Sequence, residues 1–377
     1  MRVGLLIPAA AVLLALQGCD GGEPTDERRP LTLASVIAPV TAAEVTAVRD
    51  DWDDRDTGAR SVQVEDEGTQ TWGSVQMRYT VFSHEVAGIR HFGAVLVPAS
   101  LTASDRVPVL VYTHGGYTGP GGFDFPAEAV ATRLPGEPLR SRLVHVIPSY
   151  RSERIQVAGQ TYTSGGSASI GDYDVDDTMA LLSVVIDRIP QADGSRVAVV
   201  GESRGALVAL EMGARDPRVD LVVDAYGPTD FRTPYLEGTV GEAEFLAAVR
   251  AGVAAPNDPA NLLTRALLPL DAITVEADGS LTITEDGYRR MRLTLARTSP
   301  RSYVVDLPTT QVHHGTADAT ASIADSRALR DAFIAAGRPP GSGTFSYYEY
   351  EGGGHDVTTL PGYFARVADE LTRVLNP

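Results

Sequence analysis

The sequence predicts an α/β fold in which helices cover both faces of a mostly parallel sheet. The main observation is a strand, a tight turn and a helix that follow one another without a break. Residues 196–200 form a β-branched run typical of a buried strand, residues 201–205 read Gly-Glu-Ser-Arg-Gly, and residues 206–212 favour a helix. Similar buried runs recur at residues 107–113 and 219–225.

The remaining elements follow from the same patterns. Residues 75–81 alternate between apolar and polar side chains, and residues 89–97 form their hairpin partner, which predicts an antiparallel start of the sheet. Further strands are predicted at residues 143–147, 310–313 and 344–350, and helices at residues 174–189 and 363–375.

The pentapeptide around Ser203 indicates a catalytic serine. In the arrangement strand, Gly-x-Ser-x-Gly, helix, the serine sits on a turn so tight that only glycine fits two residues to either side. Its hydroxyl is then held at the carboxyl edge of the sheet. A glycine-rich turn without catalytic meaning is the alternative for the pentapeptide alone, so partner residues must support the interpretation.

Such a serine needs a histidine base, and the histidine needs a carboxylate that fixes its tautomer. His355 lies on a glycine-rich loop directly after the strand predicted at 344–350, where a base is expected. Asp318 lies on the loop after the preceding strand and is the predicted acid, with Asp325 and Asp356 in reserve. The chain order Ser203, Asp318, His355 is that of the α/β-hydrolase fold.

An oxyanion hole is predicted upstream of the serine. The strand at residues 107–113 ends in His114-Gly115-Gly116-Tyr117. Backbone N–H groups at Gly116 and Tyr117, together with the N–H of Arg204, can donate to a developing oxyanion. Glycines suit this position because a side chain would block the approach of the backbone to a substrate carbonyl.

These motifs resemble the catalytic domain of the prolyl oligopeptidase family of serine peptidases, from about residue 92 to the C-terminus. The resemblance rests on residues 114–116, 148–151, 201–205, 314–318 and 353–355. It implies that Ser203 is the nucleophile, Asp318 the acid and His355 the base. The chain departs from the family in three ways. Ala206 follows Gly205 where a second glycine is usual, His114 stands where many members have an oxyanion tyrosine, and no N-terminal propeller is expected. An esterase related to this family is therefore an alternative to a peptidase.

Residues 228–305 are predicted to form an insertion. About eighty residues separate Gly227 from Pro308, where the sheet needs no further strand. Helices are predicted there at residues 241–251, 260–268 and 286–298. Because this position commonly carries a cap over the active site in the fold, we expect a cap, with an excursion packed away from the site as the alternative. The α/β-hydrolase domain as a whole is expected to span residues 46–377.

Charged residues near the motifs suggest how a substrate could be held. Arg151, Arg154 and Arg204 are candidates to attract a substrate carboxylate. An aminopeptidase-like activity would need acids that bind a free amine. The candidates are Glu153, Glu242 and Glu244.

Composition excludes several other chemistries. Net charge is −17 and 43% of the residues are hydrophobic, which fits a globular enzyme and argues against nucleic acid as a partner. All 32 basic residues are arginine, so a Ser–Lys dyad, a P-loop lysine and a pyridoxal phosphate site are excluded. No zinc, haem or dinucleotide motif occurs. We therefore expect neither a metal nor an organic cofactor.

The N-terminus resembles a bacterial lipoprotein signal peptide over residues 1–18. Met1-Arg2 is followed by an apolar stretch too short to span a bilayer, and then by Leu16-Gln17-Gly18-Cys19. The resemblance implies lipidation of Cys19, the single cysteine, and an extracytoplasmic protein anchored to a bacterial membrane. Residues 19–45 are expected to be a flexible tether.

Together these observations predict a serine hydrolase that works through an acyl-enzyme on a small molecule or short peptide. The family resemblance favours short-peptide hydrolysis, and a carboxylesterase acting on small esters is the alternative. A catalytically inactive lipoprotein that uses the fold for binding is a third possibility. The presence of all three triad residues argues against it.

Overall fold

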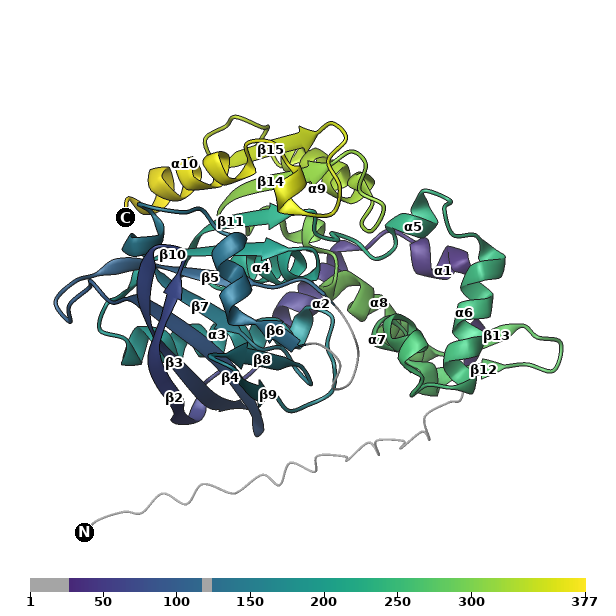
Figure 1. Cartoon of the computed structure of the whole chain (residues 1–377). Coiled ribbons are helices and arrows are strands. Elements are labelled where there is room, and N and C mark those ends of the chain that lie inside the picture. Colours follow the sequence, from purple (N-terminus) through teal and green to yellow (C-terminus); the bar gives the residue numbers. More distant parts are fainter. Residues whose placement is uncertain (1–26, 117–123) are drawn as a thin grey trace, which may run out of the picture.

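The computed structural model describes residues 27–116 and 124–377. A nine-stranded sheet lies at its centre in the order β15-β14-β11-β10-β5-β7-β4-β3-β2 (Figure 1). Its strands are β2 Arg60–Trp72, β3 Val75–Val86, β4 Ile89–Pro98, β5 Val107–Thr113, β7 Val144–Pro148, β10 Ala192–Glu202, β11 Val219–Ala225, β14 Thr309–Gly315 and β15 Phe345–Tyr350. The strands from β15 to β7 are parallel, and β4, β3 and β2 continue the sheet antiparallel. The predicted mostly parallel sheet and its antiparallel hairpin are confirmed.

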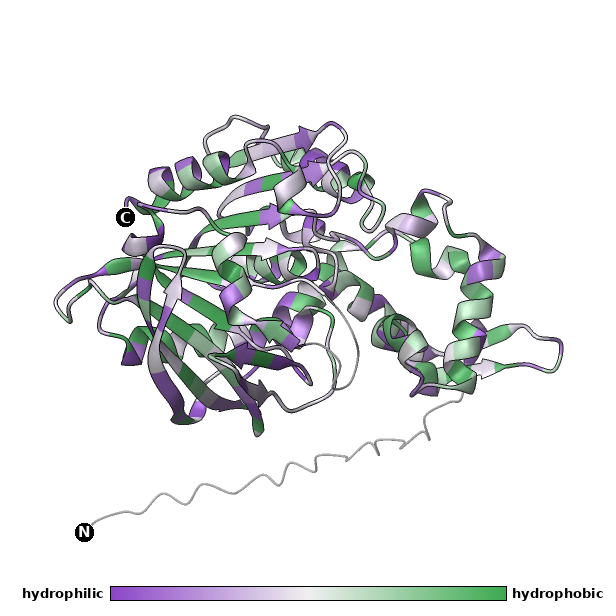
Figure 2. Ribbon diagram, in the orientation of Figure 1, coloured by the Kyte–Doolittle hydropathy of each residue, from purple (hydrophilic) through white to green (hydrophobic). Residues whose placement is uncertain are grey.

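Helices cover both faces of this sheet. The covering helices are α3 Asp172–Arg188, α4 Arg204–Arg215, α9 Ile323–Ala335 and α10 Tyr363–Leu375. On β10, Val197 and Val199 pack into one buried cluster with α3, α4 and α9, whereas Ala198 and Val200 pack into another with α10. Successive side chains of a strand point to opposite faces, so the continuous apolar run of β10 is explained by burial on both sides. Figure 2 shows the hydrophobic residues gathered on these central strands.

The edge strand β2 was not predicted. Most of its side chains are exposed or half-buried, and Val64 is 55% exposed. Because only one end of the strand, at Trp72, is buried, the alternation that marks a half-buried strand is absent from its sequence. A small three-stranded sheet, β6 Asp124–Pro126, β8 Arg154–Val157 and β9 Gln160–Thr163, was missed as well, because its strands are short.

The insertion forms a lobe beside the sheet (Figure 1). Its elements are α5 Thr233–Leu236, α6 Glu242–Ala254, α7 Leu262–Leu267, β12 Ile273–Val275, β13 Leu281–Thr284 and α8 Glu285–Arg297. The three helices predicted in this region are confirmed as α6, α7 and α8. Its apolar cluster includes Phe245, Leu267 and Met291 of the lobe together with Leu31 and Val36 of the N-terminal segment.

The segment before residue 46 corrects the predicted tether. Within the described residues, β1 Arg28–Pro30 pairs with β13 of the lobe, and α1 Leu33–Ile37 and α2 Ala42–Asp53 follow. Thr32 and Thr41 each accept a hydrogen bond from a backbone N–H in a capping box. The glycine and acidic residues that favour a tether all precede residue 28, whereas these two caps lie after it. The signal peptide at 1–18, Cys19 and the rest of the tether up to residue 26 lie outside the described residues.

Arg292 of α8 joins this N-terminal segment to the lobe. Its guanidinium donates to Glu44 Oε1 at 2.7 Å, to the carbonyl of Ala38 at 2.7 Å and to that of Pro39 at 2.6 Å. The side chain is only 5% exposed.

Over the described residues, no helix is both long and apolar enough to cross a bilayer.

Replacing Arg292 should loosen the segment. Arg292→Ala leaves the carbonyl of Pro39 and Glu44 Oε1 without their donor, whereas the carbonyl of Ala38 keeps a hydrogen bond from Arg232. We expect the variant to lower the free energy of unfolding by about 3 kcal/mol. The matched control is Arg289→Ala on the same helix, whose side chain is 69% exposed. It should have almost no effect. Urea unfolding measures both. Equal urea midpoints for the two variants would show that the contacts of Arg292 do not hold residues 27–45 in place.

Asp224 of β11 gives the fold a pH dependence. One carboxyl oxygen accepts from the N–H of Gly227 at 2.8 Å, and burial raises the pKa of Asp224 to about 7. An aspartate in the unfolded chain ionises near pH 4. Between roughly pH 4 and pH 7 the folded state therefore holds a proton that the unfolded state has released. The resulting stabilisation is complete below about pH 4 and is lost as the pH rises through 7.

Asp224→Asn should remove this dependence. Relative to the wild type, the variant should gain unfolding free energy on the order of 4 kcal/mol between pH 4 and pH 8, because the asparagine never has to ionise. Chemical denaturation at several pH values measures the difference. Stability curves that run parallel for the two proteins would contradict the assignment.

Candidate active site

Ser203 lies on the sharp turn between β10 and α4, with φ 55° and ψ −126°. A Cβ atom on Gly201 would lie 2.3 Å from the carbonyl oxygen of Gly205, and one on Gly205 would lie 2.0 Å from the carbonyl oxygen of Thr113. Real Cβ atoms do not approach so closely, so both positions require glycine. The predicted strand, turn and helix around Ser203 are confirmed.

The structure brings together the three residues predicted as a triad. His355 Nε2 lies 2.9 Å from Ser203 Oγ, and His355 Nδ1 lies 2.7 Å from Asp318 Oδ2. These distances fit a serine hydroxyl that donates to one ring nitrogen and a second ring N–H that donates to the carboxylate. Asp318 follows β14 and His355 follows β15, so all three side chains come from the carboxyl edge of the parallel sheet.

Asp318 is held by more than His355. Its Oδ1 accepts from the backbone N–H groups of Thr320 at 2.8 Å and Ala321 at 3.0 Å. Burial alone would raise the pKa of Asp318, but the hydrogen bonds from Ala321, His355 and Thr320 lower it below the usual aspartate value. The carboxylate is thus ionised and fixed in orientation at neutral pH.

A buried histidine supports the same carboxylate. His314 Nε2 lies 3.3 Å from Asp318 Oδ2, and His314 Nδ1 lies 2.6 Å from Ser326 Oγ. Burial lowers the pKa of His314, so the ring is neutral. This contact was missed by sequence reasoning, although His314 stands only four residues before the predicted acid.

The reserve acids point elsewhere. Asp325 accepts hydrogen bonds from Thr229 and Thr233, and Asp356 accepts from the N–H of Thr358 and lies 3.2 Å from Arg133. Asp318 is therefore the carboxylate that the fold sets against His355.

Ser203 and His355 open into a cavity of about 520 Å³. Its lining residues are Tyr112, Gly115, Gly116, Phe125, Arg133, Glu202, Ser203, Arg204, Tyr226, Thr320 and His355. Two of the residues predicted for the oxyanion hole, Gly116 and Arg204, are thus beside the serine, and Gly116 has a φ of 92°. Tyr117, the third, lies outside the described residues.

The insertion does not line this cavity. Within residues 27–116 and 124–377, none of the lining side chains comes from residues 228–305. The expected cap is therefore not seen over the serine, which agrees with the alternative of an excursion. Glu242 and Glu244, the acids considered there for a substrate amine, are likewise absent from the lining.

Glu202 places a carboxylate next to the serine. Tyr112 donates to its Oε1 at 2.9 Å, Tyr226 donates to its Oε2 at 2.7 Å, and Arg133 Nη1 lies 3.4 Å away. Burial raises the pKa of Glu202. The ring of Tyr226 also packs against that of His355, with centroids 4.4 Å apart. Sequence reasoning treated Glu202 as a variable position and missed this group. Tyr226 directly follows a predicted strand, which was the available signal.

The arginines considered for substrate binding are engaged in ion pairs. Arg204 donates to Glu153 Oε2 at 2.8 Å and is 6% exposed, and Arg151 donates to Asp177 at 2.8 Å. Arg154 contacts Asp124. Glu153, considered for an amine, is occupied by Arg204. Among the described residues, no group of three His, Cys, Asp or Glu side chains is arranged to hold a metal ion.

Solved structures share the fold of this chain. An acetyl xylan esterase from Paenibacillus sp. R4 is 16% identical, with a TM-score of 0.55 over 88% of this chain and 93% of that one. Acetyl xylan esterase 1 from Thermoanaerobacterium sp. is 15% identical, with a TM-score of 0.54 over 88% and 92%. An acylaminoacyl peptidase from Pyrococcus horikoshii is 14% identical, with a TM-score of 0.50 over 78% of this chain and 40% of that one.

At these identities the likeness concerns the fold alone. No curated protein sequence matches the chain. The family model described as alpha/beta hydrolase family matches residues 109–369, which include Ser203, Asp318 and His355. The chain therefore belongs to the alpha/beta hydrolase family.

Proposed function

We propose that this protein is a serine hydrolase that cleaves its substrate through an acyl-enzyme. The observation that supports this most directly is the continuous hydrogen-bonded chain from Ser203 through His355 to Asp318 at the edge of an open cavity. A binding protein would have no need of this arrangement. An inactive, ligand-binding lipoprotein is therefore the weaker hypothesis.

In this mechanism Ser203 Oγ attacks the substrate carbonyl while His355 Nε2 takes the hydroxyl proton. The carbon–leaving-group bond then breaks as His355 returns the proton to the leaving group, which leaves an acyl group on Ser203. A water molecule repeats the sequence and releases the acid. Asp318 keeps Nδ1 protonated and stabilises the imidazolium in both halves of the reaction.

The negative charge of each tetrahedral intermediate needs donors on the other side of the serine. We assign this role to the backbone N–H of Arg204 and to the N–H groups at Gly116 and Tyr117. Gly115 supports the assignment, because a Cβ atom there would lie 2.9 Å from the carbonyl oxygen of Glu202 and 3.0 Å from the Cβ of Ser203. The backbone can approach the serine only because this residue is glycine.

We propose small esters as the substrate class. Of the acids considered for binding a free peptide amine, Glu153 pairs with Arg204, and Glu242 and Glu244 do not line the cavity. Two of the structural neighbours that this chain matches over most of their length are named acetyl xylan esterases. Short-peptide hydrolysis is the second candidate, favoured by the motif resemblance to prolyl oligopeptidase family enzymes.

The segment Leu16-Gln17-Gly18-Cys19, which resembles the end of a bacterial lipoprotein signal peptide, leads us to propose in addition that the protein is anchored on the outer side of a bacterial membrane through Cys19. In that case the first strand, β1, begins nine residues after the anchor and is paired with β13 of the insertion lobe.

Replacement of the triad residues tests the mechanism. A fluorophosphonate probe should label the wild type, and Ser203→Ala should lose both the label and ester hydrolysis while it remains folded. Asp318→Asn should lower kcat by about 10⁴ because the histidine tautomer is no longer fixed. Asp356→Asn, one residue after the base, is the matched control and should keep most of the activity. Labelling that persists in Ser203→Ala would exclude this nucleophile.

A substrate panel tests the bond that is cut. We expect kcat/KM for acetyl esters of p-nitrophenol and of sugars to exceed that for matched aminoacyl and dipeptidyl amides, because an ester has a better leaving group and needs no amine-binding acid. Amide cleavage that disappears on N-acetylation of the peptide would shift the assignment to a peptidase. No turnover of any member would support the binding lipoprotein.

Substitution of the cysteine tests the anchor. Wild-type protein should fractionate with membranes and incorporate labelled fatty acid, and Cys19→Ala should lose both properties. The ester hydrolysis of the variant should be unchanged, because the described catalytic domain begins after this residue. A wild-type N-terminus at another position, without lipid, would refute the proposal.

A further inference from the structure

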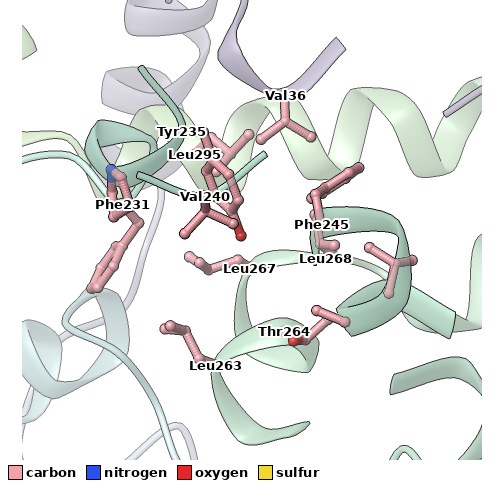
Figure 3. A pocket seen from close by; sticks show the side chains of 13 residues that line it. Val36, Phe231, Tyr235, Val240, Phe245, Leu263, Thr264, Leu267, Leu268 and Leu295 are labelled. Carbon is pink, nitrogen blue, oxygen red and sulfur yellow. The ribbon is translucent and has the colours of Figure 1, made fainter. Parts of the chain in front are cut away.

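The insertion lobe contains a second cavity, of about 210 Å³, between α1, α5, α6, α7 and α8. Figure 3 shows side chains from these elements converging on it. The lining residues are Val36, Phe231, Pro234, Tyr235, Val240, Phe245, Ala248, Val249, Leu263, Thr264, Leu267, Leu268 and Leu295. None of them lines the cavity that holds Ser203 and His355.

The lining restricts what this cavity can bind. No lining side chain is charged, and only Tyr235 and Thr264 carry a polar side-chain atom. A charged or strongly polar ligand would lose its hydration here without compensation. An apolar ligand gains van der Waals contacts on all sides, and a cavity of about 150 Å³ lined by similar residues is large enough to bind benzene. A hydrocarbon group is therefore the ligand that suits this cavity.

The cavity reaches the surface at Leu263 of α7, which lines it and is 46% exposed. Leu236 of α5, one residue after the lining residue Tyr235, is 47% exposed. A hydrocarbon chain that inserts its end from outside would bury the side chain of Leu263 as it enters.

The start of the described chain indicates where such a chain comes from. Val36 of α1 lines the cavity, and β1 is paired with β13 of the same lobe. Cys19 precedes Arg28 by nine residues. Nine extended residues span at most about 32 Å. If Cys19 is lipidated, the bilayer surface lies within this distance of β1, and lipid acyl chains become the hydrocarbon of highest local concentration.

We propose that this cavity binds one acyl chain of a membrane lipid and so docks the insertion lobe on the bilayer. The choice of a membrane lipid as occupant rests on the proposed anchor at Cys19. The hydrocarbon specificity rests on the cavity itself.

The test is a titration of purified full-length protein that carries Cys19→Ala. Because this variant has no lipid anchor, it can be handled without detergent. The probe is lauroyl-lysophosphatidylcholine below its micelle concentration, followed by calorimetry. We expect saturable one-to-one binding. Ala248→Trp places an indole at the cavity and should weaken binding at least tenfold. The matched control, Ala247→Trp, adds the same side chain at an exposed neighbour on α6 that does not line the cavity. It should bind like the parent protein.

Two further variants keep the test decisive. Leu263→Glu puts a charge on the exposed rim and should weaken binding even if Ala248→Trp fails to fold. Ser203→Ala should bind the probe normally, and hydrolysis of short esters should be unchanged in both tryptophan variants. Equal binding by Ala248→Trp and Ala247→Trp, or no saturable binding at all, would overturn the proposal.

Two other outcomes would also overturn it. Loss of binding in Ser203→Ala would place the probe in the catalytic cavity. A raised KM of Ala248→Trp for long-chain esters alone would make the occupant a substrate chain instead of a membrane lipid. Failure of the anchor is recognised separately, because it is scored by fatty acid labelling of Cys19 and the titration does not depend on lipidation.

Discussion

The contact between the turn at Ser203 and the end of β5 is the constraint on which the site depends. The backbone of Gly205 touches the carbonyl of Thr113, and the backbone of Gly201 touches Gly205. This close packing forces Ser203 to a positive φ and holds its hydroxyl above the sheet edge. The same contact sets β5 beside β10, so that Gly115 and Gly116 arrive next to the serine. The packing of Gly201 and Gly205 against the end of β5 therefore positions both the serine and the proposed oxyanion donors. It leaves no room for a Cβ atom at Gly201 or Gly205.

Around this rigid turn the polar groups are buried but partnered. Asp318 receives donors from Thr320, Ala321 and His355, and His314 supports it from the other side. Arg204, whose backbone follows the serine, has its guanidinium in a buried pair with Glu153, against the ring of Tyr150. A buried pair of this kind adds little net stability but is costly to break, so it fixes the start of α4. Glu202, in contrast, turns its carboxylate toward the cavity. With Arg133 and two tyrosines it forms a polar stretch of the cavity wall.

Sequence patterns predicted the features that depend on local chemistry. The strands β3, β4, β5, β7, β10, β11, β14 and β15 have apolar runs or alternation, and the triad residues follow strand ends in a known order. Glu202 could not be found in this way, because its tyrosine partners lie 24 and 90 positions away and only the folded sheet brings them together. His314 contacts Asp318 only four residues later, but its place beside that carboxylate also depends on Ser326, 12 positions away. The edge strand β2 is only partly buried along its length. The predicted tether is wrong over residues 28–45 because their order depends on β13 and Arg292, more than two hundred residues later. Long-range partners account for the contacts of Glu202 and the pairing of β1, whereas the strands β6, β8 and β9 are too short to predict and the two capping boxes are local signals.

In the proposed mechanism Ser203 carries the acyl group of the substrate during turnover, and this intermediate can be trapped. Wild-type protein is mixed with p-nitrophenyl acetate, quenched in acid within milliseconds and digested, and the peptides are examined by mass spectrometry. We expect an acetyl group on the peptide that contains Ser203, formed in the burst of p-nitrophenol release and absent when His355 is replaced by alanine. Rapid ester hydrolysis without any acetylated Ser203 peptide, or with the acetyl group on another residue, would contradict it.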